Sequence, residues 1–261
     1  MKHISTMEIK LISSIFVVVA NMLNKEQKER YYHTTFLKEI GEQGQEKLLN
    51  SNILVVGCGG LGSASLTYLA SMGVGHITII DNDVVSRSNL PRQVLYEYSD
   101  INKSKVEVTK TKLERMNPDI KVKSLKLRLD ENNALDLLKE YDLVLDCTDN
   151  FETKFLINDI CLKLNIPFVI AGVRDYQGQV TTCIPNKSKD FKSLFSILPI
   201  NIDDKYKKAD QGIFPFSVAL VGNIAGSEVI KYLLNIGELL LDKLLLIDLL
   251  NNHYQIVKYP E

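Results

Sequence analysis

The stretch that decides the fold is Ile53-Leu54-Val55-Val56-Gly57-Cys58-Gly59-Gly60-Leu61-Gly62. A short apolar run that ends in a glycine-rich loop is typical of a buried parallel strand. Ser63–Met72 has helical apolar spacing, glycines at 73 and 75 end that helix, and His76–Ile80 has the composition of a second strand. These segments predict a βαβ unit of about thirty residues.

The same alternation continues outward from this unit. We expect helices at Lys103–Met116, Asn132–Lys139, Phe151–Leu164 and Ile213–Leu234, strands at Ile120–Leu127, Leu143–Asp146, Phe168–Ala171 and Gln179–Ile184, and a closing hairpin of Lys243–Leu250 with Tyr254–Tyr259. Strands that alternate with helices favour an α/β fold. The sequence therefore predicts a doubly wound, mostly parallel, Rossmann-like sheet with a C-terminal antiparallel extension.

The chain divides into an N-terminal extension at 1–24, which need not be structured, and a single domain at 25–261. That domain is expected to begin with a polar helix, Lys25–Tyr32, and a linker. Within it, residues 185–211 are rich in Lys, Asp, Ser and Asn, which predicts a flexible loop with a function. Leu11–Ala20 is apolar but too short to span a bilayer, with a signal anchor as the alternative.

The charge balance argues against a nucleic-acid partner. The chain has 31 Lys and Arg against 32 Asp and Glu, a formal net charge of −1, and no basic excess to bind a phosphate backbone. The 4 cysteines include no Cys-x-x-Cys pair. This usage is typical of a reduced setting, so we expect a cytoplasmic protein with no membrane partner.

The glycine loop predicts a nucleotide site. Glycines at Gly57, Gly59, Gly60 and Gly62 would let the backbone approach phosphates at a helix N-terminus. Asp81, at the end of the second strand, is placed to accept hydrogen bonds from ribose hydroxyls. A tight turn whose glycines serve packing alone is the alternative, and the fingerprint by itself allows NAD as readily as ATP.

Three further side chains favour a triphosphate. Arg92 and Lys105 can supply cations for the phosphates, and Asp149 follows a strand end, where it can hold Mg²⁺. Each has a plain alternative: a surface ion pair for Arg92, an exposed helix position for Lys105 and a helix N-cap for Asp149. Their joint occurrence predicts a Mg·ATP site.

Eight motifs occur together in one order along the chain. They are Arg30-Tyr31, Gly57-x-Gly-Gly-x-Gly62, Asp81-x-Asp83, Ser88-Asn-Leu-x-Arg-Gln93, Lys105-Val-Glu107, Asn117-Pro118, Asp146-Cys-Thr-Asp-Asn150 and Gly178-Gln179. From Lys25 to about Lys258 the chain thus resembles the ThiF/MoeB/HesA family, which is related to the ubiquitin-activating enzymes. The resemblance implies an ATP-dependent adenylyltransferase, commonly a homodimer, that activates the C-terminal glycine of a small ubiquitin-like sulfur carrier in thiamine or molybdopterin synthesis.

The resemblance also assigns roles to individual residues. It implies that Gly60 lies against the phosphates, Asp81 on the ribose, Arg92 and Lys105 on the triphosphate, and Asp149 on Mg²⁺. Further members of the nucleotide site are then Asp83, Asn89 and Gln93. The carrier carboxylate would attack the α-phosphorus and pyrophosphate would leave, with the protein supplying position and charge.

Three departures from the family pattern stand out. His33 occupies the place of an arginine that reaches the neighbouring subunit's ATP, so that contact is weakened or taken over, for example by Arg30, unless His33 is an ordinary surface residue. The absent Cys-x-x-Cys pairs imply no zinc. The 185–211 loop has no cysteine, and Lys207-Lys208 stand in its place, with Cys183 just before the loop as the alternative acceptor. Sulfur would then come from a separate donor protein.

Other functions stay open from the sequence. Within the same chemistry, the acyl group could belong to a ribosomal peptide antibiotic precursor or be the threonylcarbamoyl group of tRNA. From other classes come an NAD-dependent oxidoreductase and a binding module without catalysis. A comparison of NAD binding with Mg·ATP binding distinguishes the oxidoreductase from the predicted adenylyltransferase. The effect of Asp149→Ala distinguishes the binding module from it.

Overall fold

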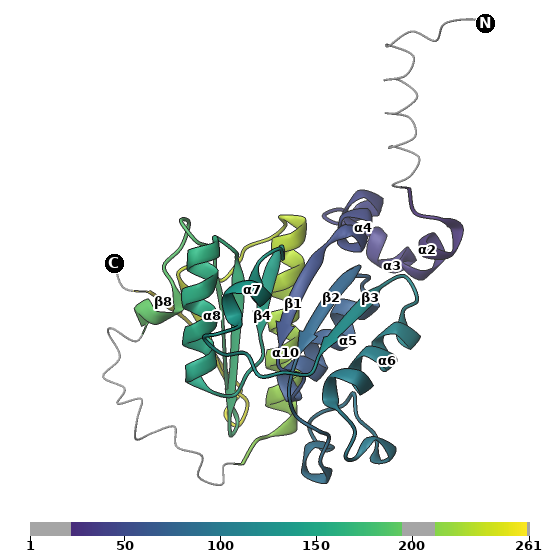
Figure 1. The fold of residues 1–261 in the computed structure, drawn as a ribbon. Coiled ribbons are helices and arrows are strands. Elements are labelled where there is room, and N and C mark those ends of the chain that lie inside the picture. The colour runs from purple at the N-terminus through teal and green to yellow at the C-terminus, as the bar shows by residue number, and fades with distance from the viewer. Residues whose placement is uncertain (1–21, 195–211, 260–261) are drawn as a thin grey trace, which may run out of the picture.

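The structure, a computed structural model, describes residues 22–194 and 212–259 (Figure 1). Its centre is an 8-stranded sheet in the order β3-β2-β1-β4-β5-β6-β7-β8. The strands are β1 Asn52–Val56, β2 His76–Ile80, β3 Lys121–Leu125, β4 Leu143–Asp146, β5 Phe168–Arg174, β6 Gln177–Cys183, β7 Lys243–Asp248 and β8 His253–Lys258. The first five strands of this order, from β3 through β2, β1 and β4 to β5, pair in parallel. Strands β6, β7 and β8 continue the sheet in antiparallel pairing. The predicted fold class is confirmed.

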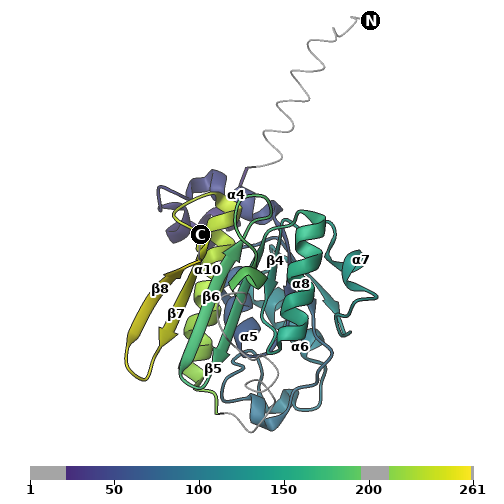
Figure 2. The same cartoon turned by 90° about the vertical axis from the view of Figure 1, so that its left-hand side faces the viewer.

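Helices cover both faces of the sheet. The helices are α2 Lys25–Arg30, α3 Tyr32–Thr35, α4 Gly41–Asn50, α5 Gly60–Ser71, α6 Lys105–Met116, α7 Ala134–Leu138, α8 Phe151–Leu164 and α10 Pro215–Leu234, with short 3-10 turns η1 Arg87–Asn89, η2 Tyr98–Asp100 and η3 Phe191–Leu194. One face carries α5, α6 and α10, and the other carries α7 and α8, as Figure 2 shows. The ends of the strands therefore lie between two layers of helices.

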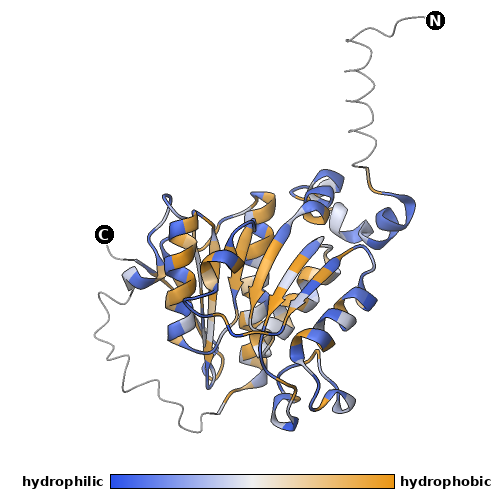
Figure 3. Ribbon diagram, viewed as in Figure 1, coloured by the Kyte–Doolittle hydropathy of each residue, from blue (hydrophilic) through white to orange (hydrophobic). Residues whose placement is uncertain are grey.

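The first strand explains why its sequence is uniformly apolar. Ile53 and Val55 belong to the core beneath α5, α6 and α10, whereas Leu54 and Val56 belong to the core beneath α7 and α8. None of the four is more than 3% exposed. Figure 3 shows the same layering, with strands of mostly apolar residues between helices of mixed hydropathy. A strand covered on both faces needs apolar residues at every position.

Helix α10 is a core helix. By length and composition alone its residues could cross a membrane, but 56% of its most apolar stretch is buried inside the structure. It packs along α5, where Ser65 Oγ donates to the carbonyl of Gly222 at 2.6 Å. This close approach brings the start of α10 next to the glycine loop.

The N-terminal part differs from the expectation of one helix and a linker. The helix breaks at Tyr31, whose buried hydroxyl accepts from Asn117 Nδ2 at 2.9 Å, and α4 occupies the expected linker. Helix α4 was missed because its first residues include two glycines, and tertiary contacts, such as Gln45 Nε2 to the Met72 carbonyl at 2.7 Å, hold it in place.

Two predicted boundaries are also changed. Leu23 is buried and Asn24 caps α2 through its side chain, so the folded part begins before residue 25. Residues 1–21 and 195–211 lie outside the described residues, and with them most of both the predicted extension and the predicted flexible loop. The described beginning of that loop is packed: Phe191 is 1% exposed and its ring stacks on Phe151 of α8.

Candidate active site

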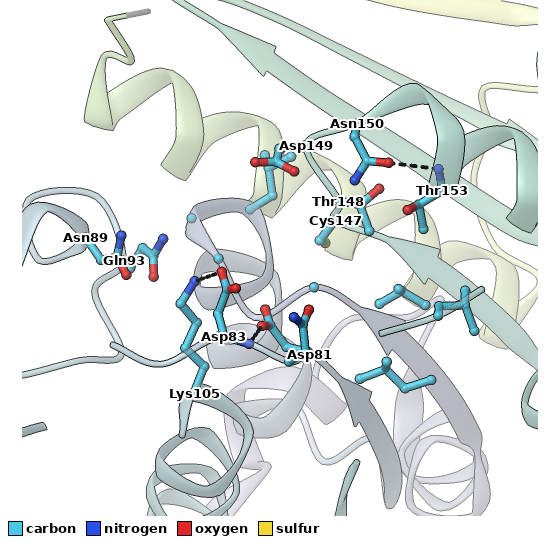
Figure 4. A pocket seen from close by; sticks show the side chains of 18 of the residues that line it. Asp81, Asp83, Asn89, Gln93, Lys105, Cys147, Thr148, Asp149, Asn150 and Thr153 are labelled. Carbon is cyan, nitrogen blue, oxygen red and sulfur yellow. Dashed lines mark hydrogen bonds and ion pairs between the residues drawn. The ribbon is translucent and has the colours of Figure 1, made fainter. Parts of the chain in front are cut away.

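A cavity of about 490 Å³ opens at the carboxyl ends of β1, β2 and β4. All the predicted site residues except Gly62 line it: Gly57, Gly59, Gly60, Asp81, Asp83, Asn89, Arg92, Gln93, Lys105 and Asp149. Figure 4 shows the polar side chains gathered around this space, with Lys105 and Asp83 on one side and the Cys147–Asn150 segment on the other. The carboxyl edge of an open α/β sheet is where such folds bind ligands.

The glycine loop is shaped by its own backbone and by α10. Gly57 has φ 97°, a conformation that L residues rarely adopt, and a Cβ there would lie 2.8 Å from the Cys147 carbonyl oxygen. A Cβ on Gly60 would lie 2.4 Å from Val218 Cγ1 of α10. Helix α5 begins at Gly60 without a side-chain cap, which leaves its leading N–H groups available to an anion.

Gly62 has a packing role. It lies inside α5, away from the cavity lining, and a Cβ there would come within 2.0 Å of the Gly57 carbonyl oxygen. Glycine is therefore required at this position for packing. For Gly60, packing against α10 and exposure to the cavity coexist.

Asp81 holds the glycine loop from one side. Its carboxylate accepts from the backbone N–H of Cys58 and from that of Asp83, each at 2.8 Å. From the other side, the buried Tyr96 hydroxyl donates to the Cys58 carbonyl at 2.7 Å. The loop is therefore fixed in shape by hydrogen bonds within the chain, and Asp81 lines the cavity beside it.

The two predicted cations differ in their surroundings. Lys105 is only 5% exposed and its Nζ lies 2.8 Å from Asp83 Oδ2. Arg92 is half-buried and donates from Nη1 to the Ser88 carbonyl at 2.8 Å, which leaves its other N–H groups free to turn toward the cavity. Both bring positive charge to the same wall.

Two amides complete that wall. Asn89 accepts from the Ser86 N–H at 3.1 Å and so fixes the turn that carries Arg92. Gln93 is 4% exposed, and its Oε1 is a buried oxygen with no hydrogen-bond partner in the described parts of the chain. A buried amide oxygen without a partner beside a cavity is a candidate ligand contact.

Asp149 lines the same cavity as the two cations and is exposed. The N-cap of α8 is Asn150, whose Oδ1 accepts from the Thr153 N–H at 2.9 Å, so Asp149 is not the helix cap. No group of three or more His, Cys, Asp or Glu side chains that could hold a metal occurs among the described residues. A single carboxylate still fits Mg²⁺, because that ion takes one or two carboxylates together with water and substrate phosphates.

Some of the lining went unpredicted. Leu127, Arg128 and Leu129 follow β3 and form a wall with Val56 and Ile80, the final residues of their strands. Its leucine, valine and isoleucine side chains give this part of the cavity an apolar surface. These residues could have been predicted from the sequence, since the ends of parallel strands converge at one edge of the sheet. Only Asp81 and Asp149 were predicted on this ground.

Residues 31–261 match the ThiF family. The chain belongs to the ThiF family. This confirms the resemblance inferred from the motifs, several of which contribute residues to the cavity lining.

Similar ThiF-family relatives are named for adenylyl transfer. The chain is 36% identical over 248 residues to "Probable adenylyltransferase/sulfurtransferase MoeZ" of Mycobacterium tuberculosis, covering 91% of this chain but only 62% of that protein. It is 36% identical to "Sulfur carrier protein adenylyltransferase" of Thermus thermophilus, covering 88% and 87%. With "Molybdopterin-synthase adenylyltransferase" of Haemophilus influenzae the identity is 37%, covering 91% and 97%.

Solved structures of E. coli MccB share the fold. A structure of MccB with ATP superposes with a TM-score of 0.80 and 25% identity, covering 99% of this chain and 80% of that one. Another, described as the microcin C7 biosynthetic enzyme MccB in complex with N-formylated MccA, has a TM-score of 0.80 and 25% identity and covers 89% and 72%.

His33, which departs from the ThiF-family pattern, and its suggested substitute Arg30 are both outside the cavity lining. His33 is exposed on α3. Arg30, considered as its substitute, has its Nε 3.2 Å from Asp119 Oδ2 in the same chain. Arg30 is thus engaged within its own subunit.

The described cysteines are buried. Cys147 lines the cavity, and burial, with a smaller contribution from the Asp146 carboxylate, raises the pKa of its thiol to about 12. Burial likewise raises the pKa of Cys183, the alternative acceptor before the loop. Neither thiol is set up as a nucleophile at neutral pH.

Proposed function

We propose that this protein is an ATP-dependent adenylyltransferase that activates the C-terminal carboxylate of a small ubiquitin-like sulfur-carrier protein as an acyl-adenylate. The observation that carries the proposal is that Arg92, Lys105 and Asp149 line one cavity together with the glycines at the uncapped start of α5. The adenylyltransferase names of the ThiF-family relatives support it.

The chemistry follows from the charges. The carrier carboxylate attacks the α-phosphorus, the bond from that phosphorus to the bridging oxygen breaks, and pyrophosphate leaves with the electron pair. Negative charge that builds on the leaving phosphates would be stabilised by Arg92, Lys105 and the α5 N–H groups. No protein nucleophile takes part, which is consistent with the buried thiols.

Asp149 would hold the magnesium ion. When bound, that ion would neutralise phosphate charge and orient the triphosphate. Within this site the chain's own task is to keep the Asp149 carboxylate facing the phosphates and to keep Asp81 beside the ribose.

The test is ATP–pyrophosphate exchange that depends on a candidate carrier with a free Gly-Gly end. Asp149→Ala should reduce exchange by at least about a hundredfold. Asp136→Ala is the matched control, because Asp136 is an exposed carboxylate on α7 outside the cavity. No exchange in either wild type or Asp149→Ala would indicate a binding module instead, and calorimetric binding of NAD but not of Mg·ATP would indicate an oxidoreductase.

A peptide precursor is the second candidate for the acyl substrate. The likeness to MccB favours it, since that protein is described as a biosynthetic enzyme in complex with N-formylated MccA. Exchange supported by a ribosomal peptide, and by no carrier protein, would replace the first substrate by the second while leaving the adenylation chemistry in place.

The proposal also covers the oligomeric state, the sulfur donor and the location of the protein. We also propose a homodimer, a separate sulfur donor and a cytoplasmic location, which the ThiF-family relationship and the free, buried cysteines support. Sedimentation of the purified protein tests the dimer. The test of a separate donor measures carrier thiocarboxylate. The protein alone should support exchange but form no thiocarboxylate until a donor protein is added.

A further inference from the structure

A buried ion pair lies directly behind the segment that carries Asp149. Asp146 is the last residue of β4 and is 0% exposed, and Lys154, near the beginning of α8, is 3% exposed. Lys154 Nζ lies 3.0 Å from Asp146 Oδ2. The same ammonium donates to the Ala171 carbonyl of β5 at 2.7 Å. Lys154 therefore ties together β4, α8 and β5 at one point.

The second oxygen of Asp146 faces the cavity segment. Asp146 Oδ1 accepts from the Thr148 backbone N–H at 2.8 Å and from Thr148 Oγ1 at 2.6 Å. Two residues later, Asn150 is fixed by its bond from the Thr153 N–H. Asp149 thus sits between two immobilised residues.

The Asp149 carboxylate itself is left open. Across 22–194 and 212–259 no hydrogen bond or ion pair engages it, although its neighbours on both sides are bonded. Its direction must then come from the backbone that carries it. An unpaired Asp146 carboxylate would be costly in this buried place, so the Thr148 turn depends on the charge of Lys154.

We propose that Lys154 is a positioning residue for the magnesium carboxylate: through Asp146 it fixes the Thr148 backbone and so aims Asp149 at the metal of Mg·ATP. This rests on the proposed function. If the pair served only to close the core between β4, α8 and β5, its loss would lower stability and leave the metal dependence of ATP binding unchanged.

The test measures ATP affinity by calorimetry, with saturating Mg²⁺ and again with EDTA, and needs no carrier protein. The dissociation constant in EDTA divided by that in Mg²⁺ gives the part of the affinity that depends on magnesium. Lys154→Met should shrink this ratio by about tenfold, the lower end of what loss of a supporting residue costs a metal site. Lys154→Arg should restore it, because an arginine keeps the charge.

A double-mutant cycle sharpens the result. Asp149→Asn should shrink the ratio strongly in the wild-type background and by about tenfold less in Lys154→Met, because the two changes act on the same interaction. Should Lys154→Met fail to fold, Thr148→Val takes its place, since it removes the Oγ1 bond to Asp146 and should move the ratio in the same direction.

The outcomes are separable. An unchanged ratio in a folded Lys154→Met protein overturns the positioning role and leaves the proposed function standing. If wild-type ATP affinity is itself indifferent to Mg²⁺, the magnesium site of the proposed function is overturned, and the positioning role with it.

Discussion

Lys105 Nζ lies 2.8 Å from Asp83 Oδ2, and the pair joins a buried ammonium to an exposed carboxylate. The side chain of Lys105 is 6% exposed and that of Asp83 is 61% exposed. Lys105 can reach a triphosphate only by leaving or sharing this partner. The pair therefore holds the cation at the cavity wall before nucleotide binds.

Replacing Asp83 tests this relationship. Asp83→Ala should lower the free energy of unfolding of the ATP-free protein by roughly 1–3 kcal/mol, since a buried ammonium loses its partner. ATP should then bind more tightly, because no ion pair has to be broken. Thermal unfolding with and without Mg·ATP measures both effects. Loss of ATP binding in this variant would show instead that Asp83 contacts the nucleotide, as the sequence predicted.

Arg92 has a matched control in Arg87. Both arginines lie in the loop after β2, but Arg87 is exposed, donates to the Tyr98 hydroxyl at 2.9 Å and does not line the cavity. Arg92→Met should reduce carrier-dependent pyrophosphate exchange by about a hundredfold, whereas Arg87→Met should leave it near wild type. Similar losses in both variants would indicate a role in the loop's fold.

Gly60 is expected to be limited by packing against α10. Because a Cβ on Gly60 would lie 2.4 Å from Val218 Cγ1, Gly60→Ala should destabilise the protein by about 1–3 kcal/mol. Adding Val218→Ala should recover part of that loss by removing the clashing methyl groups. Denaturant unfolding of the two single variants and the double variant measures the coupling. A purely additive result would place the restriction elsewhere.

The buried thiols predict slow modification and a loss of stability in alkali. Burial raises the pKa of Cys147 from 9.0 to about 12, so the folded state favours the neutral thiol. This contribution to stability is complete below about pH 9 and is lost as the pH rises toward 12. Native protein should react with dithionitrobenzoate at pH 8 far more slowly than protein unfolded in guanidinium. Rapid labelling of Cys147 in the native state would contradict the buried geometry.

Much of the fold followed from local pattern. The βαβ unit was predictable because apolar residues at every position of β1 and glycines at its end leave few alternative structures. Helix α4 and the break at Tyr31 were not predictable, because contacts with residues distant in the chain, such as Asn117, hold them in place. Local propensity is a weak guide where tertiary contacts decide.

The sequence by itself determined the ThiF-type fold, the glycine loop and the identity of the charged residues, because these depend on residue type and order along the chain. Only the tertiary structure decided which of them face one cavity, that Gly62 packs inside α5 away from it, and that Lys105 is paired with Asp83. It also joined Asp146 to Lys154 behind Asp149. The burial and direction of these side chains depend on contacts between segments that are distant in the chain, where the strand ends converge. Spacing along the sequence does not reveal such contacts.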